Sequence, residues 1–419
     1  MKKEILEKVC NSKKNLIVSG DKATGKTLNV LFPLVREIIE KKQSLLVLDT
    51  KEEYINEYYK DLISNNYNII ILNLCDFTKS NGWNPLEYPY NLYKKGKIDE
   101  ATNYIERQAN LMFSDNSTAS KLYMGIVFGL FEDGREEEIN LNSVNLMLNE
   151  IDDKIGNSNY LREYFKCKDS SSQSYIFVSN IFSVLKDTKD DIVSLVRQKL
   201  NSYVNSEILS VLLSKTTFNY TDVLTKPTAI FVITNEENEY INDIVTMFID
   251  QLFTILVKSK NHNYFNFVLD NIDTWNNVQG LSNMFSLGIS KNIKFEIATC
   301  SYEDFTKRYG NDIIKISNLI EIENDIKLWV DSEHYTDDIE CLSLLAQKGN
   351  VLYPNLEKSA INTFDIKNFV LSKDIKCDSD NSLKPDDLNA ARIDDLRQRI
   401  AKKMKELSAK EGFEDSDKD

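Results

Sequence analysis

One short stretch, NLIVSGDKATGKT at residues 15–27, restricts what this sequence can fold into. An apolar run, typical of a buried strand, leads into a loop with the pattern G-x-x-x-x-G-K-[ST]. In that pattern glycines let backbone N–H groups surround a phosphate, the lysine reaches the β and γ phosphates, and the hydroxyl binds Mg²⁺. The following helix adds the positive end of its dipole. The residues expected to bind nucleotide are Gly20, Asp21, Lys22, Ala23, Thr24, Gly25, Lys26 and Thr27.

Composition sets wide limits on function. The 419 residues are enough for two or three domains, and the net charge of −14 argues against a surface covered by nucleic acid. The six cysteines include no C-x-x-C pair and there are only two histidines, so we expect neither a structural zinc site nor a disulfide framework. No apolar window approaches eighteen residues. We therefore expect a cytoplasmic protein with reduced cysteines.

Apolar strands alternate with helical patterns on both sides of the middle of the chain. Continuous apolar runs such as SLLVLD and NIIILNL are typical of parallel strands buried on both faces. Their alternation with helical periodicity predicts a doubly wound α/β core. The expected strands lie at about residues 15–20, 44–49, 68–74, 228–233, 265–269 and 293–298.

Between about residues 96 and 224 the pattern is helical throughout. Because no convincing core strand occurs there, we expect an all-helical domain inserted into the α/β core. For the amphipathic helix near the C-terminus, docking on its own core and binding to a partner both stay open. The expected division is a core of residues 1–92 and 225–372, an insertion of residues 93–224, and an acidic linker, amphipathic helix and disordered tail in residues 373–419.

A phosphate loop works with an aspartate that follows another apolar strand and orders Mg²⁺ through water. Two residues meet this requirement: Asp270 after FNFVL, and Asp49 after SLLVL, which is nearer in sequence. The position after Asp270, where many motors have a water-aligning glutamate, is Asn271. Asparagine can hydrogen-bond to water but cannot accept its proton. Asp273, two residues on, could replace the glutamate only if the loop turns it back, and we interpret it instead as a loop aspartate that caps the residues from Thr274 onward.

Six segments in order match one known family. They are the phosphate loop, LLVLDTKEEY, ILNLCDFTKSNGWNPLEY, KPTAIFVIT, VLDNIDTW and SLGISKNIKFEIATCSYEDFTKRYG. Together they resemble the type IV secretion coupling proteins, the TraG/TraD family of conjugative motors, from about residue 15 to about residue 365. Asp49, Lys51 and Glu53 match that family's D-x-K-x-E strand end. VLDNIDTW stands at the family's strand aspartate, so the resemblance favours Asp270 over Asp49 as the Mg²⁺ residue.

The resemblance implies a RecA-like P-loop NTPase core with an inserted all-helical domain. Members usually form hexameric rings at the inner face of the cell membrane and use ATP to pass DNA–protein substrates to a secretion channel. We therefore expect ATP and Mg²⁺ as cofactors, Lys26, Asp270 and Asn271 as catalytic residues, and Thr27 and Asp270 as Mg²⁺ ligands. The expected partners are further copies of the chain in a homo-hexamer, secretion-channel or membrane-anchoring proteins, and relaxase–DNA or protein substrates.

Several features depart from the family pattern. Members usually begin with transmembrane helices, which we do not expect here, so membrane association is expected to come through partners. Asn271 replaces the family's glutamate, Ile289 stands where an arginine would contact nucleotide across the ring, and Cys300 replaces a glutamine. Isoleucine cannot stabilise transferring phosphate charge, and the nearby Lys291 is a poorer bidentate donor.

Two functions consequently stay open. One is a coupling motor driven by ATP hydrolysis, and the other is a binding or regulatory module that holds nucleotide and hydrolyses it slowly. A P-loop kinase fits less well, because it needs an arginine-rich lid and only Arg36 lies near the loop. Direct DNA binding is also open. Its candidate basic stretches, which we interpret as solvated faces, are Lys13–Lys14, Lys94–Lys97 and Arg399–Lys405.

Overall fold

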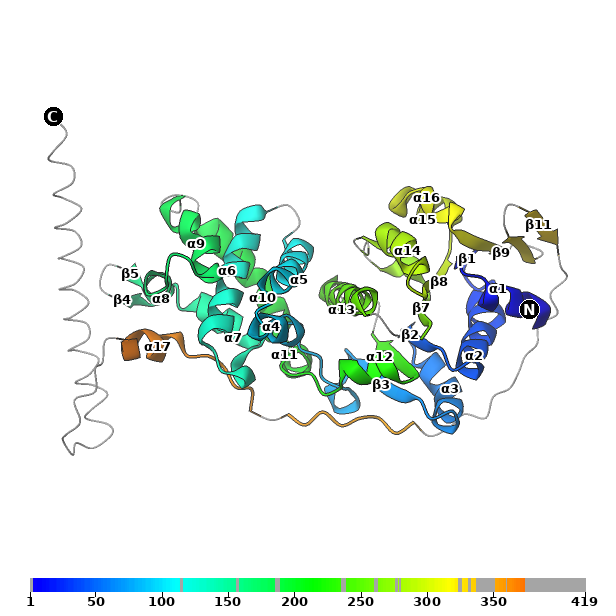
Figure 1. Cartoon of the computed structure of the whole chain (residues 1–419), viewed down its shortest axis with the longest axis horizontal. Helices are drawn as coiled ribbons and strands as arrows, with labels where there is room; N and C mark the ends of the chain where they lie inside the picture. The colour runs from blue at the N-terminus through cyan, green and yellow to red at the C-terminus, as the bar shows by residue number, and fades with distance from the viewer. Residues whose placement is uncertain are drawn as a thin grey trace. The chain divides into compact units, whose positions relative to one another are not determined.

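The described residues form two compact units, an α/β unit within residues 1–85 and 206–359 and a helical unit within residues 86–205 and 360–419 (Figure 1). The predicted amphipathic helix at the C-terminus lies outside the described residues. The computed structural model describes residues 3–113, 116–155, 158–184, 189–234, 239–259, 263–275, 278, 280–322, 326–330, 333–336, 351–358 and 360–373.

Within the described residues, the α/β unit is built on a nine-stranded sheet in the order β11-β10-β9-β1-β8-β7-β2-β6-β3. The strands from β9 to β3 pair in parallel, whereas β10 and β11 add antiparallel pairs at one edge. The α/β prediction is confirmed. The strands are β1 Asn15–Gly20, β2 Ser44–Asp49, β3 Asn68–Asn73, β6 Thr228–Ile233, β7 Phe265–Leu269, β8 Ile293–Thr299, β9 Ser317–Ile322, β10 Ile326–Val330 and β11 Glu333–Thr336.

Helices cover both faces of this sheet. Alternate strand residues such as Val18 and Val47 form one buried cluster with Leu34 of α2 and Tyr58 of α3. The helices of the unit are α1 Lys3–Asn11, α2 Phe32–Glu40, α3 Glu53–Ser64, α11 Glu207–Leu212, α12 Tyr220–Thr225, α13 Glu239–Lys258, α14 Leu281–Ile289, α15 Tyr302–Tyr309 and α16 Asp312–Lys315.

Aromatic side chains join the other face of the sheet to α13 and α14. The ring centroid of Phe253 lies 6.0 Å from that of Phe295 on β8, and the ring of Phe285 stacks on Phe295 at 4.9 Å. By length and composition, residues 240–258 of α13 could cross a membrane, but 78% of this window is buried inside the structure. Core packing therefore accounts for its apolar composition.

The helical unit packs around α6, which is buried along most of its length. Helix α9 approaches α6 closely at Gly125, where a Cβ would lie 2.2 Å from Val178 Cγ1. The elements of the unit are α4 Glu87–Lys94, α5 Ile98–Met112, α6 Ser117–Asp133, α7 Leu141–Asn149, β4 Lys154–Ile155, β5 Ser158–Asn159, α8 Tyr160–Lys166, α9 Gln173–Val184, α10 Lys189–Val204 and α17 Ile366–Lys373.

The two units differ from the predicted domains at their boundaries. Helices α11 and α12 belong to the α/β unit, although the sequence placed them in the insertion. Trp83 contacts both helices: its backbone N–H donates to the Leu212 carbonyl of α11 at 2.9 Å, and its Nε1 donates to Tyr220 Oη of α12 and to Gln251 Oε1, each at 3.0 Å. A helical pattern in the sequence does not reveal such partners.

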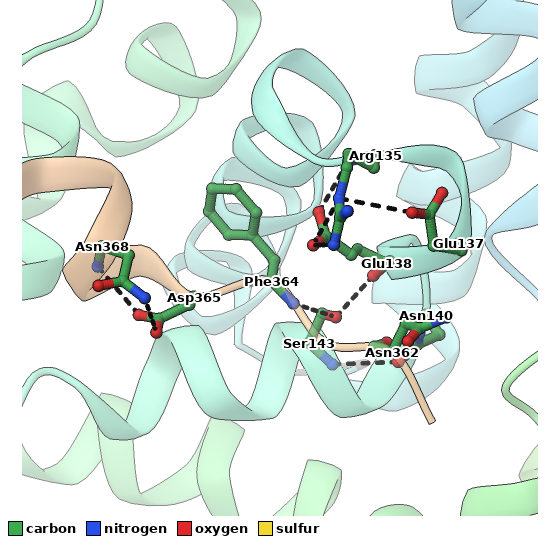
Figure 2. A network of polar contacts seen from close by, with 9 residues as sticks. All are labelled: Arg135, Glu137, Glu138, Asn140, Ser143, Asn362, Phe364, Asp365 and Asn368. Atoms are coloured by element: carbon green, nitrogen blue, oxygen red, sulfur yellow. Dashed lines mark hydrogen bonds and ion pairs between the residues drawn. The ribbon is translucent and has the colours of Figure 1, made fainter. Parts of the chain in front are cut away.

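The segment that contains α17 belongs to the helical unit, although the sequence placed it in the core. Asn140 Nδ2 donates to the Asn362 carbonyl at 2.9 Å, and the Phe364 N–H donates to Ser143 Oγ at 3.0 Å (Figure 2). The Ser143 hydroxyl in turn donates to the Glu138 carbonyl at 2.6 Å. Residues 360–373 therefore return to the helical unit through specific polar contacts.

We expect Ser143→Ala to lower the free energy of unfolding by about 1–2 kcal/mol, because the Phe364 N–H loses its acceptor. Urea denaturation followed by circular dichroism measures the difference. Ser179→Ala is the matched control, since the Ser179 hydroxyl donates within its own helix, to the Ile176 carbonyl. Faster amide exchange of residues 360–370 should accompany the first change alone, and equal exchange in the two variants would contradict this docking.

A buried carboxyl on β8 predicts a dependence of stability on pH. Glu296 of β8 is buried, and burial raises its pKa from 4.5 to about 7, although the Lys294 charge lowers it. The folded state therefore binds this proton more tightly than the unfolded state, so the free energy of unfolding falls as pH rises from about 4.5 to about 7.

Glu296→Gln is expected to flatten this decline and to raise the free energy of unfolding at pH 8 by about 2 kcal/mol. Urea denaturation at intervals between pH 4.5 and 8 provides the measurement. Glu303→Gln, on the exposed side of α15, should leave the decline unchanged. A Glu296→Gln variant with the pH profile of the wild type would show that another group causes it.

Candidate nucleotide-binding site

The phosphate-loop sequence folds as a sharp turn after β1. A Cβ at Gly20 would lie 2.8 Å from the Ile322 carbonyl oxygen and 2.9 Å from Thr24 Oγ1. Gly25 has φ +85°, a left-handed conformation that glycine adopts without strain. Glycine is thus required at position 20 because neighbouring atoms approach closely, and at position 25 because the backbone has a positive φ.

Lys26 is folded into this turn. Its side chain is buried, and Nζ donates to the carbonyl oxygens of Gly20 at 2.5 Å and of Asp21 at 2.9 Å. The chain then continues as a π-helical turn, Lys26–Leu31, before α2. Pro33 lies at the start of α2, where its missing N–H interrupts regular helical bonding. The lysine ammonium is therefore held at the centre of the loop.

Asp270 immediately follows β7 and lies beside Thr27. Its Oδ2 accepts hydrogen bonds from Thr27 Oγ1 at 2.7 Å and from Tyr54 Oη at 2.9 Å. The carboxylate is 6% exposed, and among the described residues its Oδ1 has no hydrogen-bond partner. The structure thus brings together the two residues that the sequence predicts as Mg²⁺ ligands.

Asp49, the competing candidate, caps a helix instead. Its Oδ1 accepts from the Glu53 N–H at 2.8 Å and its Oδ2 from the Ile55 N–H at 2.9 Å. Burial raises the pKa of this carboxyl to about 6, although the backbone hydrogen bonds lower it. Both oxygens are occupied by the start of α3, so the geometry favours Asp270 at the metal position.

A hollow of about 710 Å³ opens beside the loop. Its lining comes from segments that follow β1, β7, β2 and β8, neighbours in the sheet whose carboxyl ends meet at one edge. Asn271, in the left-handed conformation with φ 53°, lies in this wall. The lining residues are Lys22, Ala23, Thr24, Gly25, Lys26, Thr27, Leu28, Lys51, Glu53, Asn271, Asp273 and Cys300.

The interpretation of Asp273 as a cap for the residues from Thr274 onward is wrong. Its Oδ1 accepts from Thr299 Oγ1 at 2.6 Å, and its Oδ2 accepts from the Cys300 N–H. Asp273 therefore joins the segment after β7 to the end of β8. Asp273 and Cys300, joined by this contact, both line the hollow.

Ile289 and Lys291 lie elsewhere in the same chain. Helix α14 ends at Ile289 and β8 begins at Ile293, so these residues precede the amino end of β8. The hollow lies at the opposite, carboxyl edge of the parallel sheet, and neither residue lines it. Within one chain, the departure at Ile289 therefore leaves the phosphate loop unaffected.

Sequence reasoning missed Tyr54 as a partner of Asp270, and it assigned no site role to Lys51 and Glu53. All three follow β2, which neighbours β7 in the sheet. Their position just after an apolar strand was visible in the sequence. The strand order that sets Tyr54 beside Asp270, and Lys51 and Glu53 in the wall of the hollow, was not.

The family model described as "Type IV secretory system Conjugative DNA transfer" matches residues 9–270, more than half of the 419 residues. The chain belongs to this family. No curated protein sequence matches it.

Solved structures of the plasmid coupling protein TrwB share the fold. TrwB in complex with the non-hydrolysable GTP analogue GDPNP aligns with a TM-score of 0.54 at 12% identity, covering 84% of this chain and 88% of TrwB. TrwB in complex with ADP and Mg²⁺ aligns with a TM-score of 0.53 at 13% identity, covering 85% and 87%. The likeness confirms the RecA-like core with its helical insertion.

Proposed function

We propose that this member of the conjugative DNA transfer family binds Mg-ATP in the hollow beside β1 and uses it to recruit or move DNA–protein substrates. The observation that carries the proposal is the meeting of Lys26, Thr27 and Asp270 at one edge of the sheet. Cation, hydroxyl and carboxylate there match the charges of a Mg²⁺–triphosphate. TrwB, which has the same fold, has been solved with nucleotide and Mg²⁺.

The residues have distinct proposed roles. Lys26 exchanges the carbonyls of Gly20 and Asp21 for the β and γ phosphates, and the loop N–H groups contact the remaining phosphate oxygens. Thr27 would supply its hydroxyl to Mg²⁺. Asp270 fits because its Oδ2 contacts that hydroxyl and its buried Oδ1 has no hydrogen-bond partner among the described residues. Mg²⁺ held by these two residues would supply positive charge beside the phosphates.

A second function is a nucleotide-dependent binding module that hydrolyses ATP slowly. Asn271 supports it, because this residue lines the hollow at the position where a water-activating carboxylate would follow the strand aspartate. In this function, bound nucleotide stabilises one conformation of the protein, and that conformation recruits a substrate or partner protein without ATP hydrolysis. Asn271 in that case only orients water by hydrogen bonding.

Binding and turnover of Mg-ATP separate these functions. Calorimetric titration with Mg-ATP measures affinity, and phosphate release measures hydrolysis. Saturable binding with turnover near 1 s⁻¹ or faster supports the motor. Binding with much slower turnover supports the module. Failure to bind ATP, with or without Mg²⁺, overturns both.

Family membership also supports proposals on assembly and location. We propose rings of identical chains, held at the inner face of the cell membrane by anchoring or secretion-channel proteins and supplied with relaxase–DNA or protein substrates. Sedimentation with and without Mg-ATP tests the ring. Binding to single-stranded DNA over a salt series tests direct contact, since phosphate contacts weaken steeply with salt.

A further inference from the structure

We infer that Tyr54 is a positioning residue for Asp270: its hydroxyl fixes one carboxylate oxygen so that the other is presented to Mg²⁺ or its water. This inference rests on the proposed Mg-ATP function. Its basis is the unequal use of the two oxygens. Oδ2 accepts from both Tyr54 Oη at 2.9 Å and Thr27 Oγ1 at 2.7 Å, whereas Oδ1 is buried without a hydrogen-bond partner among the described residues.

Tyr54 is itself held rigidly. Asp49 accepts the N–H groups of Glu53 and Ile55, the residues on either side of Tyr54 in the chain. The Tyr54 ring lies edge-on to that of Phe32, with centroids 4.6 Å apart and planes at 64°. The backbone is thus fixed by the end of β2, and the ring is fixed by the start of α2.

The direction of the hydrogen bond is also set. Tyr54 is fully buried, and the carboxylate oxygen beside it can only accept, so the phenol hydroxyl donates to Asp270 Oδ2. A carboxylate oxygen that is buried and unpartnered is costly, and a hydrated cation beside it would satisfy it. Two donors on Oδ2 fix the plane of the carboxylate, and this plane determines where Oδ1 points.

Removing such an outer partner of a metal ligand typically costs 10- to 100-fold in metal affinity. Tyr54→Phe deletes the hydroxyl and keeps the ring that packs on Phe32. We expect the gain in ATP affinity that Mg²⁺ provides to fall by about 10-fold or more in this variant. ATP affinity in EDTA should stay unchanged, because Lys26 and the loop are untouched.

Titration of ATP in EDTA and at a series of Mg²⁺ concentrations tests this inference. Tyr58→Phe is the matched control, because Tyr58 lies one turn further along α3 and its hydroxyl donates to the Phe32 carbonyl at 2.6 Å. It should keep the Mg²⁺ response of the wild type. Thermal unfolding of each variant verifies that the fold is retained.

A double-mutant comparison provides a second test of the positioning role. Asp270→Asn should reduce the Mg²⁺ response, and adding Tyr54→Phe to it should then change nothing further. A Tyr54→Phe variant with the wild-type Mg²⁺ response, or an equal loss in EDTA, overturns the positioning role alone. A wild type whose ATP binding ignores Mg²⁺, or is absent, overturns the proposed function and this inference together.

Discussion

Lys26→Ala is expected to weaken ATP binding by about 100-fold or more. The ammonium is the buried cation at the centre of the loop, and each charge-assisted hydrogen bond to phosphate contributes about 1.5–3 kcal/mol. Losing two such bonds corresponds to at least about 3 kcal/mol, and each 1.4 kcal/mol is tenfold in affinity. The variant also loses the bonds from Nζ to Gly20 and Asp21 that shape the loop.

Calorimetric titration with Mg-ATP measures this loss, and thermal unfolding establishes that the variant is folded. Lys226→Ala is the matched control. Lys226 precedes β6 at the amino edge of the sheet, and it pairs with Asp222 in an exposed ion pair at 3.0 Å. This control should bind ATP as the wild type does. Equal affinities in the two variants would show that nucleotide binds outside the loop.

The strands and the phosphate loop were predictable because their signals are local. Parallel strands such as β2 and β3 are largely continuous apolar runs, and apolar, β-rich segments predict the strands β1, β2, β3, β6, β7 and β8. In the loop, Gly25 has a positive φ, and Gly20 lies close both to Thr24 within the loop and to the distant Ile322 carbonyl of β9. The motif therefore predicts the phosphate loop, although the close fit at Gly20 also depends on a long-range neighbour.

The choice between Asp49 and Asp270 could not be made from local patterns. Both residues follow an apolar strand, and they differ in what the sheet brings beside them. Strand β7 lies next to β8, which pairs with β1, so Asp270 reaches Thr27. Asp49 turns to the first N–H groups of α3. Strand order and helix capping therefore determine which aspartate lies beside Thr27. In the sequence, only the family resemblance favoured Asp270 over Asp49.

The limits of the two units were also hidden from local patterns. The helical pattern between about residues 96 and 224 does not reveal which core buries α12, and the sequence predicted no separate helix at α17. Tyr220 of α12 contacts Trp83, whereas the segment before α17 is held by Asn140 and Ser143 of the helical unit. Each assignment depends on partners more than 130 residues away in sequence. Such pairs carry no periodic signal.

Phe285→Ala is expected to lower the free energy of unfolding by about 3–5 kcal/mol. Phe285 of α14 is fully buried and stacks on Phe295, with centroids 4.9 Å apart and planes at 17°. Phe295 in turn stacks on Phe267 of β7 at 4.9 Å and 13°. Truncation therefore leaves a cavity against β8 and removes one end of a three-ring stack.

Leu287→Ala on the same helix is the matched control, because Leu287 is 54% exposed and its loss should cost less than about 0.5 kcal/mol. Urea denaturation of both variants measures the two differences. The stack also bears on the site, since β7 leads directly into Asp270. Phe285→Ala should therefore bind Mg-ATP less tightly as well as unfold more easily, while Leu287→Ala should do neither. Equal destabilisation by the two substitutions would mean that α14 packs on the sheet through a different face.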